Sequence, residues 1–121
     1  MRLKNNEIYR YGKFLSLFNN YNAKLPIRIG FYLQKNLQIM MQAAEEIEVA
    51  RLEIAARFGT INADGTGYDI PTENLTEVNH ELKDLFDLEQ ELPIHIFKLD
   101  EFEGIELTYQ QLSAIMFMIE E

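Results

Sequence analysis

The strongest constraint on this chain is a run from residue 32 to residue 58 in which apolar residues return every three or four positions. A stripe with this period is typical of an amphipathic helix. Gly59 follows directly, as expected at a helix C-terminus. The sequence therefore predicts one long helix, with charged residues on its polar side and these residues on its apolar face: Leu33, Leu37, Met40, Ala44, Ile47, Ala50, Ile54 and Phe58.

Three further segments have helical spacing. The first covers residues 6 to 18, and the second is the amphipathic stretch "TENLTEVNHELKDLFDLEQE". The third begins at Tyr109, because Thr108 and Gln111 have the spacing of a capping box. The side chains expected to point inward are Ile8, Tyr11, Phe14, Leu15 and Phe18 in the first, Leu75, Val78, Leu82, Leu85 and Leu88 in the second, and Leu112, Ile115, Met116 and Ile119 in the third.

Two short segments alternate between apolar and other residues and predict strands. They are "LPIRIGF" at residues 25 to 31 and "LPIHIFKL" at residues 92 to 99, each with a proline suited to a strand start or edge. We expect them to be neighbours in one small sheet, with a third strand from residues 1 to 4, from residues 67 to 70 or from a second subunit. The predicted fold is a helix-dominated α+β single domain over residues 1 to 121, with about four helices and a two- or three-stranded sheet.

The loop "INADGTGYDIPTE" imitates the spacing of a calcium-binding EF-hand. Asn62, Asp64, Thr66, Gly67 and Glu73 fall at positions 1, 3, 5, 6 and 12 of a twelve-residue loop. However, Asn62 stands where a carboxylate is expected. "ADGTG" also has turn chemistry, in which Asp64-Gly65 closes a reversal and Gly67 allows a positive φ. The sequence favours a connecting hairpin over a calcium site.

The chain offers no recognisable catalytic motif. It contains no cysteine, and His80 and His95 lie on different predicted elements without an HExxH motif. Ser16 and Ser113 lie inside predicted helices rather than in a GxSxG turn. There is no Walker loop and no GxGxxG motif. We therefore predict a protein that is not an enzyme and that needs no metal or cofactor.

Charge is distributed unevenly along the 121 residues, whose net charge is −9. Residues 1 to 36 sum to +6 and residues 61 to 121 sum to −13. This polarity favours contacts between the two halves, within one subunit or between neighbours, and works against nucleic-acid binding. No apolar run reaches the length of a membrane span, and the N-terminus lacks the apolar core of a signal peptide. The sequence predicts a soluble protein that binds neither membranes nor nucleic acid.

Aromatic and basic residues are interleaved in the N-terminal third. Tyrosine and arginine are enriched in protein interfaces, so this pattern indicates a face that binds protein. The C-terminal helix is apolar nearly all round, which favours a homo-oligomer. The candidate partner-binding residues are Arg10, Tyr21, Arg28, Tyr32, Tyr68 and Phe117.

The whole chain resembles a family of small, uncharacterised proteins encoded by tailed phages and prophages of Gram-positive bacteria. The resemblance lies in "MRLKNNEI", "KLPIRIGFYLQKNL", "EVARLEIAARFG" and "IELTYQQLSAIMFMIEE". It implies a phage protein located in the host cytoplasm or in the virion, with other phage proteins or a host protein as partners. The leading hypothesis is a minor virion component or a tail or head assembly factor. The alternative is an inhibitor of a host defence system whose acidic half imitates DNA.

Overall fold

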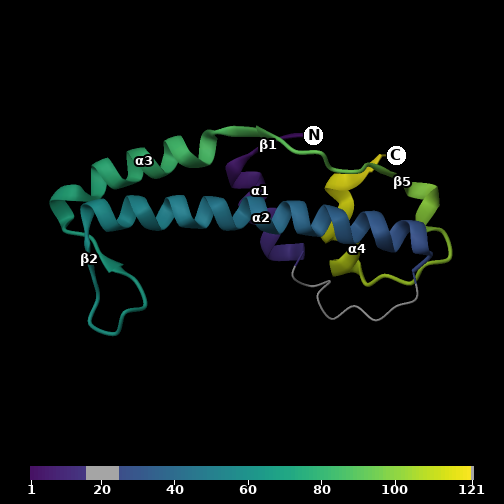
Figure 1. Cartoon of the computed structure of the whole chain (residues 1–121), viewed down its shortest axis with the longest axis horizontal. Coiled ribbons are helices and arrows are strands. Elements are labelled where there is room, and N and C mark those ends of the chain that lie inside the picture. The colour runs from purple at the N-terminus through teal and green to yellow at the C-terminus, as the bar shows by residue number, and fades with distance from the viewer. Residues whose placement is uncertain (16–24, 121) are drawn as a thin grey trace.

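The computed structural model describes residues 1–15 and 25–120, and α-helices dominate it (Figure 1). Its strands form three separate two-stranded ladders, not one sheet. The helix-dominated α+β fold is thus confirmed. The elements are β1 (Arg2–Lys4), α1 (Asn5–Leu15), α2 (Ile27–Phe58), β2 (Thr60–Ile61), β3 (Tyr68–Asp69), η2 (Thr72–Asn74), α3 (Leu75–Asp87), β4 (Glu89–Glu91), β5 (Phe97–Lys98), η3 (Leu99–Phe102), α4 (Tyr109–Ile115), η4 (Met116–Met118) and β6 (Ile119–Glu120).

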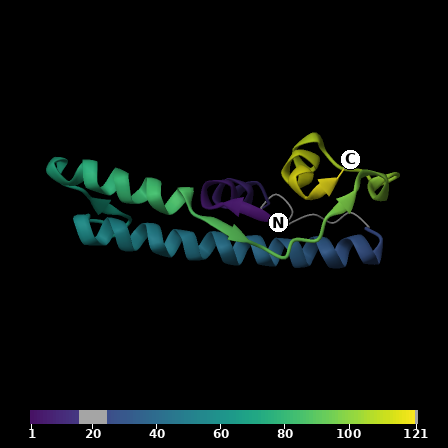
Figure 2. The same cartoon turned by 90° about the horizontal axis from the view of Figure 1, so that it is seen from above.

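Helix α2 is the scaffold of the molecule. Figure 2 shows α1, α3 and α4 on the same side of this 32-residue helix. Its inner face is buried at the spacing that the sequence predicts, with Leu33, Met40 and Ile47 at 4%, 0% and 2% exposure. Helix α1 crosses it closely, because a Cβ added to Gly12 would lie 3.1 Å from the Ala44 Cβ. The core is therefore a layer between one face of α2 and the shorter elements.

The strand predicted at residues 25 to 31 is wrong, because α2 begins at Ile27. Pro26 precedes the helix, and its carbonyl accepts a hydrogen bond of 2.9 Å from the Gly30 N–H. The apolar alternation in this segment also fits a helix: Ile29 continues the buried stripe one turn before Leu33, whereas Ile27 is 89% exposed. The period of the inner face thus extends through the segment.

Residues 92 to 99 also differ from the prediction, since only Phe97–Lys98 form a strand. Leu92 and Ile94 are buried, as the alternation suggests. The backbone of His95 does not pair with a neighbouring strand. The buried Asn36 side chain takes that place: its Nδ2 donates to the His95 carbonyl at 2.9 Å, and its Oδ1 accepts from the His95 N–H at 2.8 Å. The segments "LPIRI" and "LPIHI" are therefore not neighbouring strands.

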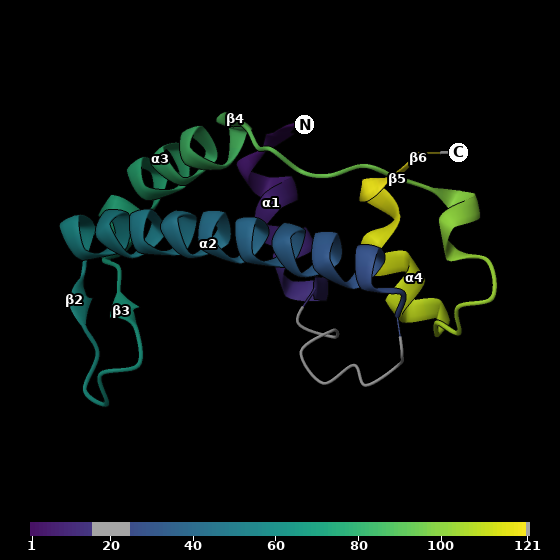
Figure 3. The same ribbon diagram turned by 45° about the vertical axis from the view of Figure 1, so that its right-hand side comes forward.

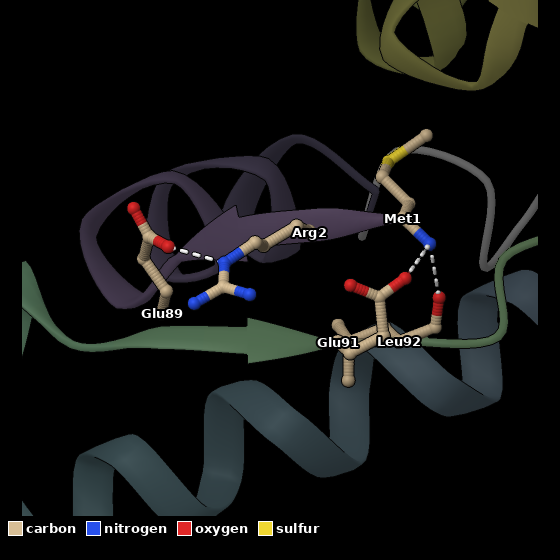
Figure 4. Close-up of polar contacts among 5 residues, drawn as sticks. All are labelled: Met1, Arg2, Glu89, Glu91 and Leu92. Carbon is tan, nitrogen blue, oxygen red and sulfur yellow. Dashed lines mark hydrogen bonds and ion pairs between the residues drawn. The ribbon is translucent and has the colours of Figure 1, made fainter.

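The N-terminal strand joins distant parts of the chain. Strands β1 and β4 pair antiparallel, with Leu3 opposite Gln90. Residues 2 to 4 thus form a strand, one of the predicted alternatives, but it pairs with β4 and not with the predicted sheet. Figure 4 shows the N-terminal ammonium of Met1 donating to Glu91 Oε1 at 3.1 Å and to the Leu92 carbonyl at 2.7 Å, beside an Arg2–Glu89 ion pair. Basic and acidic parts of the sequence therefore meet within one subunit.

The loop after α2 forms a hairpin that projects from one end of the helix (Figure 3). This confirms the predicted hairpin, although the positive φ falls on Gly65 (φ 74) and not on Gly67. Gly59 is required for close approach: a Cβ there would lie 2.6 Å from the Asp69 carbonyl oxygen. The backbone of Gly59 is extended, with φ −141, so Gly59 does not adopt the left-handed conformation found at many helix C-termini.

At the opposite end of α2, the C-terminal segment closes the core. Thr108 and Gln111 form the predicted capping box of α4. Past Ile115 the chain changes to a 3-10 turn, which shifts the helical phase. As a result Met116, predicted to point inward, is 38% exposed, and Met118 is fully buried instead. In the second predicted helix, Leu75 is 42% exposed, and Leu88 lies beyond the end of α3 and is 58% exposed, so the inward placement of both is wrong.

Candidate partner-binding groove

A groove of about 820 Å³ lies beside η3 and α4. Its apolar floor comes from Phe102, Ile105, Leu107 and Leu112, with Leu99 at its edge. Leu99 is 47% exposed, so apolar surface is available at the rim. The remaining lining residues are charged: Lys98, Asp100, Glu103 and Glu120.

Local hydrogen bonds fix the wall formed by η3. The Lys98 N–H donates to Glu101 Oε2 at 2.7 Å, which caps the start of this turn. Glu101 also pairs with Arg28 on α2. The Lys98 backbone N–H and then Arg28 lower the pKa of Glu101. Gly104 has φ 77, a conformation that suits glycine, and it turns the chain toward Ile105. The wall is thus anchored to α2.

The electrostatics of the groove favour a cationic ligand. Three carboxylates, Asp100, Glu103 and Glu120, line it against the one ammonium group of Lys98. Charges of one sign around a low-dielectric surface attract the opposite charge. An apolar floor with an acidic rim therefore fits a segment that presents both apolar and basic side chains.

A chain of aromatic contacts connects α2 to the groove floor. Tyr32 stacks on His95 with ring centroids 3.9 Å apart, His95 meets Phe97 edge-on at 4.8 Å, and Phe97 meets Phe102 at 5.3 Å. The Arg28 guanidinium lies 5.5 Å from the Tyr32 ring centroid. The structure thus brings the predicted residues Arg28 and Tyr32 together, and they support the groove from behind.

Two other predicted partner-binding residues belong to a second cluster. Phe117 stacks on Tyr11 at 4.4 Å between ring centroids, with the planes within 4° of parallel. The guanidinium of Arg10 lies 5.2 Å from the centroid of the same tyrosine ring. Arg10 and Phe117 are therefore joined through Tyr11, between α1 and η4. Tyr68 is half-buried in the hairpin, apart from both clusters, and Tyr21 lies outside the described residues.

In the calcium-like loop, polar side chains hydrogen-bond to other groups of the same loop. The Asp64 carboxylate accepts from the Thr66 hydroxyl at 2.7 Å and from the Thr66 N–H at 3.2 Å, and these two bonds lower the pKa of Asp64. Asn62 Oδ1 accepts from the same N–H at 3.0 Å. Glu73 lies beyond the hairpin, on η2. Within the described part of the chain, no group of three or more His, Asp or Glu side chains is arranged to hold a metal ion.

Both histidines contact other side chains of the chain. His80 is exposed on α3 and lies 3.6 Å from Asp84 Oδ2. His95 is packed between aromatic rings, and its Nε2 atom is buried without a hydrogen-bond partner among the residues that the structure describes. The two residues lie on separate elements, as the sequence predicts.

One ion network links α1 to α2. The Arg51 side chain donates to both oxygens of Glu48, at 2.5 and 3.0 Å, and the Tyr9 hydroxyl donates to Glu48 at 2.8 Å. These bonds, that of Arg51 first, lower the pKa of Glu48 to about 2. The same carboxylate raises the pKa of Tyr9. The network holds two helices together at the edge of their interface.

Sequence reasoning did not identify the groove residues. A signal was present in "LDEFEGIEL", where Leu99, Phe102, Ile105 and Leu107 recur among acids. The concave arrangement depends on the turn at Gly104 and on the packing of α4, neither of which the local pattern reveals.

Comparison with known proteins gives no match to a protein-family model, to a curated protein or to a solved structure. Among the described helices, none is both long and apolar enough to cross a membrane. The groove and the aromatic contacts behind it are therefore the basis for a functional proposal.

Proposed function

We propose that this chain is a non-enzymatic protein that acts through contact with another protein, and that its groove holds a basic amphipathic segment of that partner. The observation that carries the proposal is the combination of an apolar floor with three carboxylates on the lining. Phe102 and Leu107 would receive apolar side chains, and Asp100 and Glu103 would meet lysine or arginine. Aromatic and aliphatic pockets with a polar rim are the usual anatomy of a binding interface.

The wider role that we propose is that of a minor virion component or an assembly factor of a tailed phage. It is supported by the sequence resemblance to phage-encoded proteins. Mass spectrometry of purified particles and of assembly intermediates tests it. Detection in particles supports a virion component, and detection only in intermediates supports an assembly factor. A protein missing from both would overturn this role while leaving the groove to be tested separately.

Binding at the groove is tested with a twelve-residue peptide that alternates leucine and lysine, compared with a leucine–glutamate peptide. We expect backbone amide NMR shifts in residues 98 to 107 and 112 with the basic peptide only. The triple variant Asp100→Asn, Glu103→Gln, Glu120→Gln should weaken binding about tenfold, and so should raising the salt to about 0.5 M.

A matched variant separates groove binding from general attraction to an acidic protein. Glu73→Gln, Glu77→Gln, Asp84→Asn removes the same charge from exposed positions on η2 and α3. We expect this control to bind the basic peptide within about twofold of the unaltered chain. Equal loss in both triple variants, or amide shifts centred on α3, would show that the groove is not the site.

The geometry favours the DNA-mimicking alternative less. Four acids at the end of α3 and in β4, Asp84, Asp87, Glu89 and Glu91, are taken as the mimic. Of these, Glu89 pairs with Arg2, Glu91 with the N-terminal ammonium and Asp87 with Lys83. His80 lies beside the fourth, Asp84. Cations of the same chain thus neutralise much of this surface. Binding to a purified host nuclease, lost when these four acids are changed to amides, would favour the alternative.

A further inference from the structure

The outer face of α2 is exposed along the length of the helix and is poor in charge. Figure 2 shows no described element on that side, and only at its edge do Met41 and Glu45 line a small pocket beside α1. Five of its apolar side chains are 39 to 89% exposed: Ile27, Phe31, Met41, Val49 and Leu52. Between them lie Gln34, Gln38 and Gln42, so that Glu45 is the only charged residue near the middle of the stripe. Depletion of charge in a central strip is typical of an interface core.

Charges appear on one flank of this stripe, and their sign changes along the helix. Arg28 and Glu46 are 18 residues apart, as are Lys35 and Glu53. Eighteen residues are about five full turns, so each pair occupies the same angular position. The flank is therefore basic toward the N-terminus of α2 and acidic toward its C-terminus.

This arrangement is complementary to itself when two helices run antiparallel. A twofold axis passing between Met40 and Met41 places residue 28 level with residue 53 of the second copy, and residue 35 level with residue 46. The axis also brings the same flank of both helices together. Lys35 then meets Glu46 of the second copy, and this contact occurs twice. In a parallel dimer with the twofold axis along the helices, this flank would face the opposite flank of the second copy, so that Lys35 and Glu46 would not meet.

The same register matches the apolar residues. Phe31 falls between Val49 and Leu52 of the second copy, and Ile27 falls beside Leu52 of the second copy. Glu45 lies level with the amides of Gln34 and Gln38 of the second copy, which can donate to its carboxylate. One register thus accounts for both the charge pattern and the apolar pattern.

We propose that the outer face of α2 is the interface of an antiparallel homodimer with its twofold axis between Met40 and Met41. At 1.5 Å per residue the overlap of residues 27 to 54 is about 42 Å long. With a helix about 10 Å wide, the two faces together cover on the order of 800 Å², which is less than the roughly 1,200 Å² of stable specific interfaces and is typical of weak, transient ones. We therefore expect a reversible dimer, with a Kd in the micromolar range. It does not depend on the groove.

Paired charge variants test the register. Lys35→Glu and Glu46→Lys should each weaken dimerisation about tenfold or more, since each sets like charges together twice. An equimolar mixture of the two single variants should dimerise within about threefold of the unaltered chain, because each contact in the mixed dimer again joins opposite charges. Analytical ultracentrifugation between about 2 and 200 µM gives the Kd values.

Recovery in the mixture also shows that both variants fold. Glu73→Lys on η2 is the control, because it changes an exposed acid outside α2 and should leave the Kd unchanged. A monomer of 14.2 kDa at every concentration would overturn the proposal. So would a mixture that associates no better than either single variant.

Cysteine cross-linking gives a second, independent measurement, because the natural chain has no cysteine. Met41→Cys lies next to the axis and should form a disulfide-linked dimer on mild oxidation. Phe31→Cys should not link to itself but should link to Val49→Cys when the two are mixed. Self-linking of Phe31→Cys without linking of Met41→Cys would indicate parallel helices and would contradict the proposal.

Discussion

Met40 and Met41 are neighbours in α2, yet one side chain is fully buried and the other is 46% exposed. The same contrast holds along the helix: the inner face packs against α1 and α3, whereas Figure 2 shows no described element on the opposite side. Both faces contain apolar and amide side chains. The difference teaches that composition does not identify the core side of α2. The period of the apolar stripe does so, together with the segments that pack on it, and matched substitutions on the two faces measure the contrast.

The largest effect is expected from Met40→Ala. It leaves a cavity in the core and should lower the free energy of unfolding by about 3 kcal/mol. Met41→Ala, one position away, should cost less than about 0.5 kcal/mol. Urea denaturation followed by circular dichroism, at a concentration that favours the monomer, measures both. Equal losses would mean that the two faces are not distinct.

Asn36→Ala should have the next largest effect. It removes the two hydrogen bonds that the amide makes to the His95 backbone, and the unfolding free energy should fall by about 2 kcal/mol. The His95 amide should also exchange faster with deuterated water. Gln38→Ala, which removes an exposed amide on the outer face, is the control and should change neither quantity appreciably. A slow-exchanging His95 amide in Asn36→Ala would show that another group holds this backbone.

The smallest effect concerns Glu48 at the edge of the inner face. Because folding lowers its pKa from 4.5 to about 2, its contribution is complete above pH 4.5 and is lost as the pH falls toward 2. The side chain is 34% exposed, so solvent screening reduces this contribution to about 1 kcal/mol. Glu48→Gln should remove that part of the acid dependence in urea denaturation.

Glu53→Gln is the outer-face control for this measurement, because Glu53 has no hydrogen-bond or ion-pair partner among the described residues. This variant should keep the acid dependence of the unaltered chain. If Glu48→Gln and Glu53→Gln titrate alike between pH 4.5 and 2, the network with Arg51 and Tyr9 contributes nothing measurable.

Much of the fold could be predicted because its signals are local. The stripe from Leu33 to Ile54 sets which side of α2 is inward, and Thr108 with Gln111 sets the start of α4. The reversal at Asp64-Gly65 predicts the hairpin. The candidate site was predicted less well: Arg28 and Tyr32 lie behind the groove, while Phe102 and Leu107, which form its floor, were not identified. Phe102 and Leu107, which recur among acidic residues, line a common groove only because the chain bends at Gly104.

The sequence by itself determined the inner stripe of α2, the capped start of α4 and the hairpin, since these follow from period, capping and turn chemistry among residues a few positions apart. The tertiary structure decided which groups hydrogen-bond to the backbone of the extended segments. Asn36 satisfies His95 across 59 positions, and β1 pairs with β4 across nearly 90. Such contacts require loop closure that no local pattern encodes. For this reason, the two segments predicted as neighbouring strands form instead the start of α2 and an extended segment held by the Asn36 amide.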